Sequence, residues 1–206
     1  MSRRDAIVLA SASPRRRELL AQVGLAATVA PADIDEAVRT GETPADHVVR
    51  LSEAKALAVA GRDAVHGRWF IGSDTVVVRD AAILGKPADA AEAAAMLRSL
   101  SGRGHEVVSG YAVHDRASGR TTSGAVVTRV WFKALTEEEI AGYIATGEPF
   151  DKAGAYAIQG IGAFMVPRIE GSYPNVVGLP LCEVIAALEE FGAARLFAPV
   201  RPGRVP

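Results

Sequence analysis

The stretch Trp69–Val78 reads Trp-Phe-Ile-Gly-Ser-Asp-Thr-Val-Val-Val, a run of aromatic and β-branched residues that contains one carboxylate. This composition predicts a strand that is buried in a sheet. Asp74 lies in the middle of the run, where an ionised carboxylate is costly unless it is paired or coordinated. Asp74 is therefore a candidate catalytic or metal-binding residue. The alternative is that the strand breaks at Gly72-Ser73 and leaves Asp74 in an exposed bulge.

The segments around this strand predict a mixed sheet that is covered by helices. Arg79-Asp80 turns the chain into a short return strand, and two long strands at about 106–113 and 121–132 have the pattern of a β-hairpin. A capping residue followed by proline marks a helix start at Ser13-Pro14 and again at Thr43-Pro44. Further strands are expected at 6–10, 28–30 and 83–84, strand pieces around Ala157 and at 164–169, and helices at 14–24, 43–60, 89–100, 136–147 and 180–191.

Length and composition bound the domain organisation. The chain has 206 residues, of which 49% are hydrophobic and 23% charged, a balance typical of a globular protein. The order of strands and helices predicts one α/β domain over residues 1–195. Residues 196–206 contain Pro199, Pro202 and Pro206 and predict a frayed tail.

Charge and cysteine content exclude several classes of function. A net charge of −1 gives no overall attraction to nucleic acid or to an anionic membrane. No stretch reaches the roughly 18 consecutive apolar residues that a spanning helix requires. The only cysteine, Cys182, cannot form an intramolecular disulfide, and the first five residues lack a signal-like pattern, so we expect a cytoplasmic protein. The four histidines have no spacing that suits a zinc site or a Ser-His-Asp triad.

The strand, loop and helix at 6–23 form a candidate anion site. Ser11 and Ser13 precede a helix whose first turn contains Arg15, Arg16 and Arg17. Positive charge at this end of a helix opposes the macrodipole, which is understandable if an anion is bound there. The segment is not a P-loop, because it lacks the glycines and the Gly-Lys-Ser/Thr ending. The alternative is a capped helix with a solvated basic face.

Four more residues are weaker candidates. Lys55 shares a helix face with apolar residues, so its ammonium either extends to solvent or points into a cleft. Lys86 follows the return strand, near the mouth of the same sheet, and Gln159 is a polar residue in an apolar, glycine-rich block. Glu36 could join Asp74 in holding a hard divalent cation, although an ordinary surface acid is the commoner explanation for such a residue.

Taken together and in chain order, these segments resemble the Maf family of nucleoside triphosphate pyrophosphatases. The resemblance extends over nearly the whole chain and leaves out only the tail. The matching pieces are Leu9-Ala10-Ser11-Ala12-Ser13-Pro14-Arg15-Arg16, Ile34-Asp35-Glu36, Ala54-Lys55-Ala56, Gly72-Ser73-Asp74-Thr75-Val76-Val77, Gly85-Lys86-Pro87, Leu100-Ser101-Gly102, the block 151–160, and Gly171-Ser172-Tyr173-Pro174-Asn175-Val176-Val177-Gly178-Leu179-Pro180.

The resemblance implies a fold, a cofactor and a set of site residues. It implies an elongated α/β fold with a deep cleft between two lobes, akin to the inosine triphosphate pyrophosphatases, and often a homodimer. It also implies a divalent cation (Mg²⁺, Mn²⁺ or Co²⁺) and a link to cell-division arrest. Asp74 would accept a proton, Glu36 would bind the metal, and Ser11, Arg15, Arg16, Lys55 and Lys86 would surround the phosphates.

Three residues match the branch of the family that hydrolyses dTTP and UTP. They are Arg15 after the proline, Thr75 after the candidate catalytic aspartate, and Gln159 in the glycine-rich block. Thr75 and Gln159 carry groups that can meet the O4/N3/O2 edge of a pyrimidine, while Arg15 can bridge base and phosphates. The branch that acts on 7-methyl-GTP differs at these positions.

The expected reaction is metal-dependent attack of water at the α-phosphorus, which releases pyrophosphate. Cationic side chains would neutralise the triphosphate and Asp74 would activate the water; at this point Asp74 can be either the base or a metal ligand. A nucleotide-binding regulator of septation without turnover is the main alternative. A nucleic-acid-binding module built on Arg15–Arg17 is disfavoured, because the chain is nearly neutral and lacks interleaved aromatic and basic residues. We therefore expect a nucleoside triphosphate as partner, and neither nucleic acid nor membrane.

Overall fold

A computed structural model describes residues 6–197, and a mixed seven-stranded sheet forms its centre. The strand order is β2-β1-β3-β5-β6-β7, and β4 pairs with β3 beside this path. β1 pairs in parallel with β2 and β3, whereas the other pairs are antiparallel. The strands are β1 (Ile7–Leu9), β2 (Ala27–Val29), β3 (Trp69–Arg79), β4 (Ala82–Leu84), β5 (Gly104–Asp115), β6 (Arg120–Trp131) and β7 (Arg168–Glu170).

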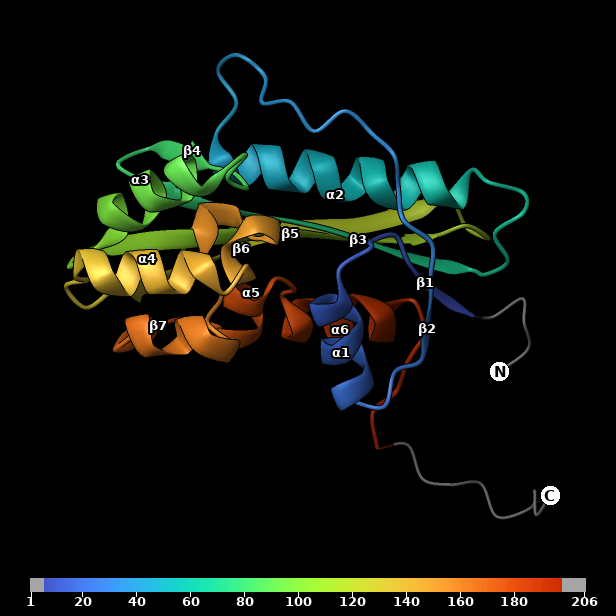
Figure 1. Ribbon diagram of the computed structural model, residues 1–206. Coiled ribbons are helices and arrows are strands. Elements are labelled where there is room, and N and C mark those ends of the chain that lie inside the picture. Colours follow the sequence, from blue (N-terminus) through green and yellow to red (C-terminus); the bar gives the residue numbers. More distant parts are fainter. Residues whose placement is uncertain (1–5, 198–206) are drawn as a thin grey trace.

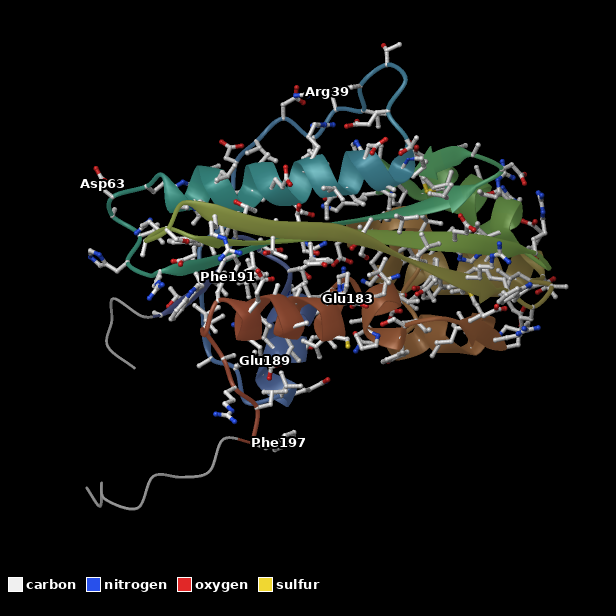
Figure 2. All side chains as sticks on the ribbon, turned by 180° about the vertical axis from the view of Figure 1, so that it is seen from behind. Arg39, Asp63, Glu183, Glu189, Phe191 and Phe197 are labelled. Carbon is white, nitrogen blue, oxygen red and sulfur yellow. The ribbon has the colours of Figure 1, made fainter. Side chains whose placement is uncertain are left out.

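Helices cover both faces of this sheet, which confirms the expected α/β fold. In Figure 1, α2 lies along one face, while α1 and α6 lie beyond the other. Figure 2 shows the same two layers from behind, with Glu183 and Glu189 on α6 on the far side of the sheet from α2. The helices are α1 (Pro14–Gln22), α2 (Pro44–Ala60), α3 (Ala90–Leu100), α4 (Glu137–Ala145), α5 (Tyr173–Val177) and α6 (Leu181–Glu190), with 3₁₀ turns η2 (Glu148–Asp151), η3 (Ala153–Ala155) and η4 (Gly160–Met165).

Local sequence signals explain where the helices begin. Thr43 caps α2, with its side chain accepting a hydrogen bond from the amide of Asp46. Thr136 and Glu139 form a capping box at the start of α4. Ser13 is the N-cap of α1, as predicted, but its side chain makes no capping hydrogen bond.

The glycine-rich segment 153–165 differs from its prediction. Strand pieces around Ala157 and at 164–169 were expected, but the segment forms η3 and η4, and β7 begins only at Arg168. Gly154 and Gly160 both have φ of +67°, a left-handed conformation that turns the chain and interrupts any strand. The predicted tail lies outside the described residues from position 198 onward. Among the helices of residues 6–197, none has the length and apolar character needed to cross a bilayer.

The two ends of β3 contribute to two different hydrophobic clusters on the same face of the sheet. Side chains of alternate residues point to one face, where Trp69 and Ile71 pack with α1 and α6, and Val77 packs with α3 and α4. Between these two clusters the same face contains Ser73 and Thr75. β3 runs unbroken through Asp74, so the alternative of a strand break at Gly72-Ser73 is wrong. The polar middle of a long strand is therefore where a site can form.

Helix α2 rests directly on the sheet at two glycines. A Cβ atom on Gly72 would fall well inside contact distance of the Ser52 carbonyl oxygen and 2.8 Å from the Ala56 amide nitrogen. A Cβ on Gly110, the cross-strand partner of Asp74, would similarly overlap the Val48 carbonyl. The absence of side chains at these positions lets α2 approach the sheet closely enough for its own side chains to reach Asp74.

A buried histidine gives the fold a predictable sensitivity to acid. His105 Nε2 lies 2.8 Å from the Tyr156 hydroxyl, Nδ1 has no hydrogen-bond partner within residues 6–197, and burial lowers the pKa of His105 to about 4. Below pH 6.5 the unfolded chain therefore binds a proton that the folded chain does not, so the free energy of unfolding falls as pH drops from 6.5 toward 4.

We expect His105→Gln to flatten this part of the pH profile, since glutamine keeps a polar contact with Tyr156 but does not titrate. Between pH 7 and pH 5 the wild type should lose about 2 kcal/mol more of unfolding free energy than the variant, at about 1.36 kcal/mol per pH unit below 6.5. Urea denaturation at pH 5, 6 and 7 measures this difference. Parallel profiles for the two proteins would contradict it. The pKa of Asp115 is lowered to about 2, so the stability that ionised Asp115 contributes is lost only below about pH 4, outside the range of this experiment.

Candidate functional site

A cleft of about 780 Å³ opens at the middle of β3. β1 pairs with β3 at residues 69–71, and β4 pairs with it on the same side at 77–79. Within the described residues, no strand is registered against positions 72–76 on that side. All nine predicted site residues line the cleft: Ser11, Arg15, Arg16, Glu36, Lys55, Asp74, Thr75, Lys86 and Gln159.

Lys55 joins the two candidate acidic residues. Its Nζ lies 2.7 Å from Asp74 Oδ1 and 2.6 Å from Glu36 Oε1. Lys55 and Asp74 are buried, so Lys55 points into the cleft rather than to solvent. Burial alone would raise the pKa of Glu36, but the hydrogen bond from Lys55 and the charges of Lys86 and Arg16 hold it below its usual value. Glu36 therefore stays ionised beside Asp74.

Helix α2 fixes the backbone of Asp74 as well as its side chain. The amide of Asp74 donates a hydrogen bond of 3.1 Å to Ser52 Oγ, one turn before Lys55 on α2. Asp74 Oδ2 accepts no hydrogen bond from the described residues, which leaves it open to the cleft. Ser52 was not among the predicted site residues. Its position three residues before Lys55, on the same face of a helix, is the only sequence signal that could have indicated it.

Arg16 is held entirely by the protein. Its guanidinium donates to Ser11 Oγ at 3.0 Å, to the carbonyl oxygens of Ser73 and Gly178 at 2.7 Å each, and to Thr75 Oγ1 at 3.2 Å. The Thr75 hydroxyl also lies 2.8 Å from Ser109 Oγ. Arg16 is thus a fixed positive charge beside Asp74, and Thr75 is one of the groups that orient it.

Two more cationic residues, Arg15 and Lys152, lie at the edge of the cleft and share the carboxylate of Asp151. Arg15 Nη1 lies 3.0 Å from Asp151 Oδ2, and Lys152 Nζ contacts the other oxygen of Asp151 and donates to the Glu148 carbonyl at 2.6 Å. Asp151 is exposed, so a bound anion can compete with it for Arg15 and Lys152. Lys152 and Asp151 were recognised only as part of a glycine-rich block. The scarcity of lysine, four among 23 basic residues, was the one hint at Lys152.

Lys86 and Gln159 face the cleft without an internal partner. Lys86 is exposed and Gln159 half-buried, and neither side chain has a hydrogen bond to another described residue. Both are therefore available to a ligand. Lys86 lies after β4 in the chain, and Gln159 lies between η3 and η4.

A family model described as Maf-like protein matches residues 6–191. The chain belongs to the Maf family. Similar proteins support this assignment over almost the full length, and all three that follow are named dTTP/UTP pyrophosphatase. One from Syntrophotalea carbinolica is 67% identical over 95% of this chain and 89% of its own length, and one from Geobacter metallireducens is 58% identical over 94% and 100%. A third, from Myxococcus xanthus, is 54% identical over 90% of this chain and 92% of its own length.

The acidic residues of this Maf cleft suit a divalent ion that is completed by substrate oxygens. Within residues 6–197, no group of three or more His, Cys, Asp or Glu side chains could hold a metal by itself. Glu36 and Asp74 nevertheless converge on one cationic atom, Lys55 Nζ. Two carboxylates together with phosphate oxygens are the usual environment of Mg²⁺ in nucleotide enzymes. The donor set therefore fits such an ion only when a phosphorylated substrate is present.

Proposed function

We propose that this Maf protein is a nucleoside triphosphate pyrophosphatase that hydrolyses dTTP and UTP to the monophosphate and pyrophosphate. The observation that carries the proposal is the clustering of the predicted residues around one open stretch of β3. Five cationic side chains and three carboxylates line this cleft. Such an excess of positive charge in a nearly neutral chain suits a triphosphate. The names of the relatives in the three bacteria agree with this function.

In the proposed reaction, water attacks the α-phosphorus and the bond from that phosphorus to the α,β-bridging oxygen breaks. Pyrophosphate leaves with the bonding electrons, and Asp74 takes the proton from the water. Oδ2 of Asp74 is the oxygen for this role, because Oδ1 is bonded to Lys55. Arg16 and Lys55 stabilise the charge that develops on the α-phosphate, while Arg15, Lys86 and Lys152 bind the departing phosphates.

Membership in a family of nucleotide pyrophosphatases suggests a divalent metal. We propose that Glu36 and Asp74 hold it, and that it supplies charge neutralisation at the phosphates when bound. Lys55 then holds both carboxylates in place. Restoring EDTA-treated protein with Mg²⁺, Mn²⁺ or Co²⁺ in turn identifies the ion, and activity of the metal-free protein equal to that of the loaded protein would contradict the proposal.

The proposed function includes selectivity for the base of the nucleotide, and Gln159 is the residue that we expect to contact the base. Its carboxamide offers both a donor and an acceptor to the edge of uracil or thymine, and no protein group among the described residues occupies it. Thr75 supports the site through Arg16, since its hydroxyl is already bonded. A site that hydrogen-bonds its substrate rejects analogues because mismatched groups stay unpaired.

We expect the wild type to prefer dTTP and UTP over purine triphosphates, and Gln159→Ala to erode that preference more than it lowers the maximal rate. Losing one or two hydrogen bonds to the base should reduce the ratio of kcat/KM for UTP over GTP by about 10-fold. Measuring kcat/KM for dTTP, UTP, CTP, GTP and ATP with both proteins tests this expectation. Unchanged ratios in the variant, or a wild type that favours GTP, would show that Gln159 does not read the base.

A further inference from the structure

One half-buried carboxylate outside the cleft, that of Glu148, organises the loop that carries Gln159. Glu148, at the start of η2, accepts three hydrogen bonds: from the Tyr143 hydroxyl at 2.9 Å, the Gly162 amide at 3.0 Å and the Ile161 amide at 3.1 Å. Burial would raise the pKa of Glu148, but these hydrogen bonds outweigh it and hold the pKa below its usual value. An ionised carboxylate thus binds the backbone immediately after Gln159.

The chain must turn sharply to reach this carboxylate. Gly160 has φ of +67°, and a Cβ atom there would lie 2.7 Å from Glu148 Oε2. Only glycine combines this left-handed backbone with such a close approach. The loop is therefore wrapped around the Glu148 side chain, with Gln159 on the residue before the turn.

The same pair of side chains also holds the loop on the other side of Gln159. The Tyr143 hydroxyl, which donates to Glu148, accepts a hydrogen bond of 3.2 Å from the amide of Ala157. Tyr143 is buried on α4, within the core cluster formed with α3. Positions 157, 161 and 162 are thus tied to the hydrogen-bonded pair of Tyr143 and Glu148, while the Gln159 side chain is left free at the cleft.

The position of the Gln159 backbone matters because a glutamine carboxamide can both donate and accept a hydrogen bond. Its oxygen accepts and its nitrogen donates, so a shift of the backbone along the base edge brings the wrong one of these two groups opposite the base. Uracil presents an acceptor at O4, whereas cytosine presents a donor at N4. A carboxamide whose backbone can shift along the base edge would satisfy both bases equally well, and a site discriminates only when its polar groups are held in position by their surroundings.

We propose that Glu148 and Tyr143 are positioning residues that set the discrimination of UTP from CTP by fixing the loop around Gln159. The proposal rests on the proposed function, in which Gln159 faces the base. Neither Glu148 nor Tyr143 lines the cleft. Besides holding the loop, Glu148 accepts a hydrogen bond from the cleft residue Lys152 through its backbone carbonyl, a contact that a side-chain substitution keeps.

The test compares kcat/KM for UTP and CTP in wild type, Glu148→Gln and Tyr143→Phe, with thermal unfolding of each protein. Glu148→Gln keeps the shape but turns one acceptor into a donor that opposes an amide N–H. Tyr143→Phe removes the hydroxyl from both Glu148 and Ala157. Each variant should reduce the UTP/CTP ratio about 3- to 10-fold, the equivalent of one net hydrogen bond, while kcat for UTP changes less.

Glu139→Gln is the matched control, because Glu139 is a hydrogen-bonded carboxylate in the capping box of the same helix α4, and its own hydrogen bonds go to Thr136 and Lys133 rather than to the Gln159 loop. It should lower the unfolding temperature slightly and leave the UTP/CTP ratio unchanged. A normal ratio in both folded test variants, or the same fall of the ratio in Glu139→Gln, would overturn the proposal. If Glu148→Gln fails to fold, Tyr143→Phe decides by itself. A wild type that does not hydrolyse UTP would instead contradict the proposed function.

Discussion

Replacing Asp74 with asparagine is expected to lower kcat for UTP by at least about 10²-fold, the usual effect of losing a general base. Asparagine has nearly the same volume and keeps a side-chain oxygen for Lys55. The hydrogen bond from the backbone amide of residue 74 to Ser52 Oγ is also kept. What the substitution removes is the oxygen that accepts the proton and the negative charge beside Glu36.

Thermal unfolding and steady-state kinetics of the same Asp74→Asn preparation separate the loss of chemistry from loss of fold. Asp80→Asn is a suitable control, since Asp80 follows the same strand but is exposed and pairs with Arg103 at the surface. It should leave kcat unchanged. Near-normal turnover by folded Asp74→Asn would rule Asp74 out as the base.

Gly72→Ala is expected to have the largest effect on stability, with a loss of at least about 3 kcal/mol of unfolding free energy, at the upper end for overpacking a core. The added methyl group would overlap the Ser52 carbonyl, a backbone atom that cannot move by a side-chain rotation. Relief requires α2 to shift away from the sheet. Because α2 carries Ser52 and Lys55, any folded fraction should also lose activity.

Gly142→Ala is the matched control for this prediction. Gly142 is an exposed residue of α4, and a Cβ there meets nothing within 4 Å. Alanine should be neutral or stabilise the helix by about 0.5–1 kcal/mol. Urea denaturation of the three proteins provides the comparison. A Gly72→Ala protein as stable as the wild type would mean that α2 does not rest on the sheet as described.

The long helices, the long strands and several site residues could be predicted because each has a local signal, whereas the short helix α5 was not predicted. Asp74 interrupts a β-branched run, and Lys55 interrupts an apolar helix face; the structure brings both into one ion pair. Proline and capping residues marked the helix starts of α1 and α2 closely. These features depend on residues within a few positions of one another, which is why the sequence alone was sufficient.

The remaining features depend on contacts between distant parts of the chain. Arg16 is bonded to the Gly178 carbonyl, 162 positions away, and nothing near Arg16 in sequence indicates that contact. The open edge of β3 exists because β1 and β4 pair on the same side and leave a gap, a matter of topology. In the segment around Ala157, apolar residues suggested strands, but glycines in left-handed conformations allowed the chain to wrap around Glu148 instead.

Hydrolysis of UTP in ¹⁸O-labelled water tests the central claim most directly, because the position of the label identifies the phosphorus that water attacks. The proposed reaction breaks the bond between the α-phosphorus and the bridging oxygen, so UMP should carry one ¹⁸O atom and pyrophosphate none. Mass spectrometry of the two products reads this out in one experiment. Label in the pyrophosphate, or release of UDP and inorganic phosphate, would contradict the account.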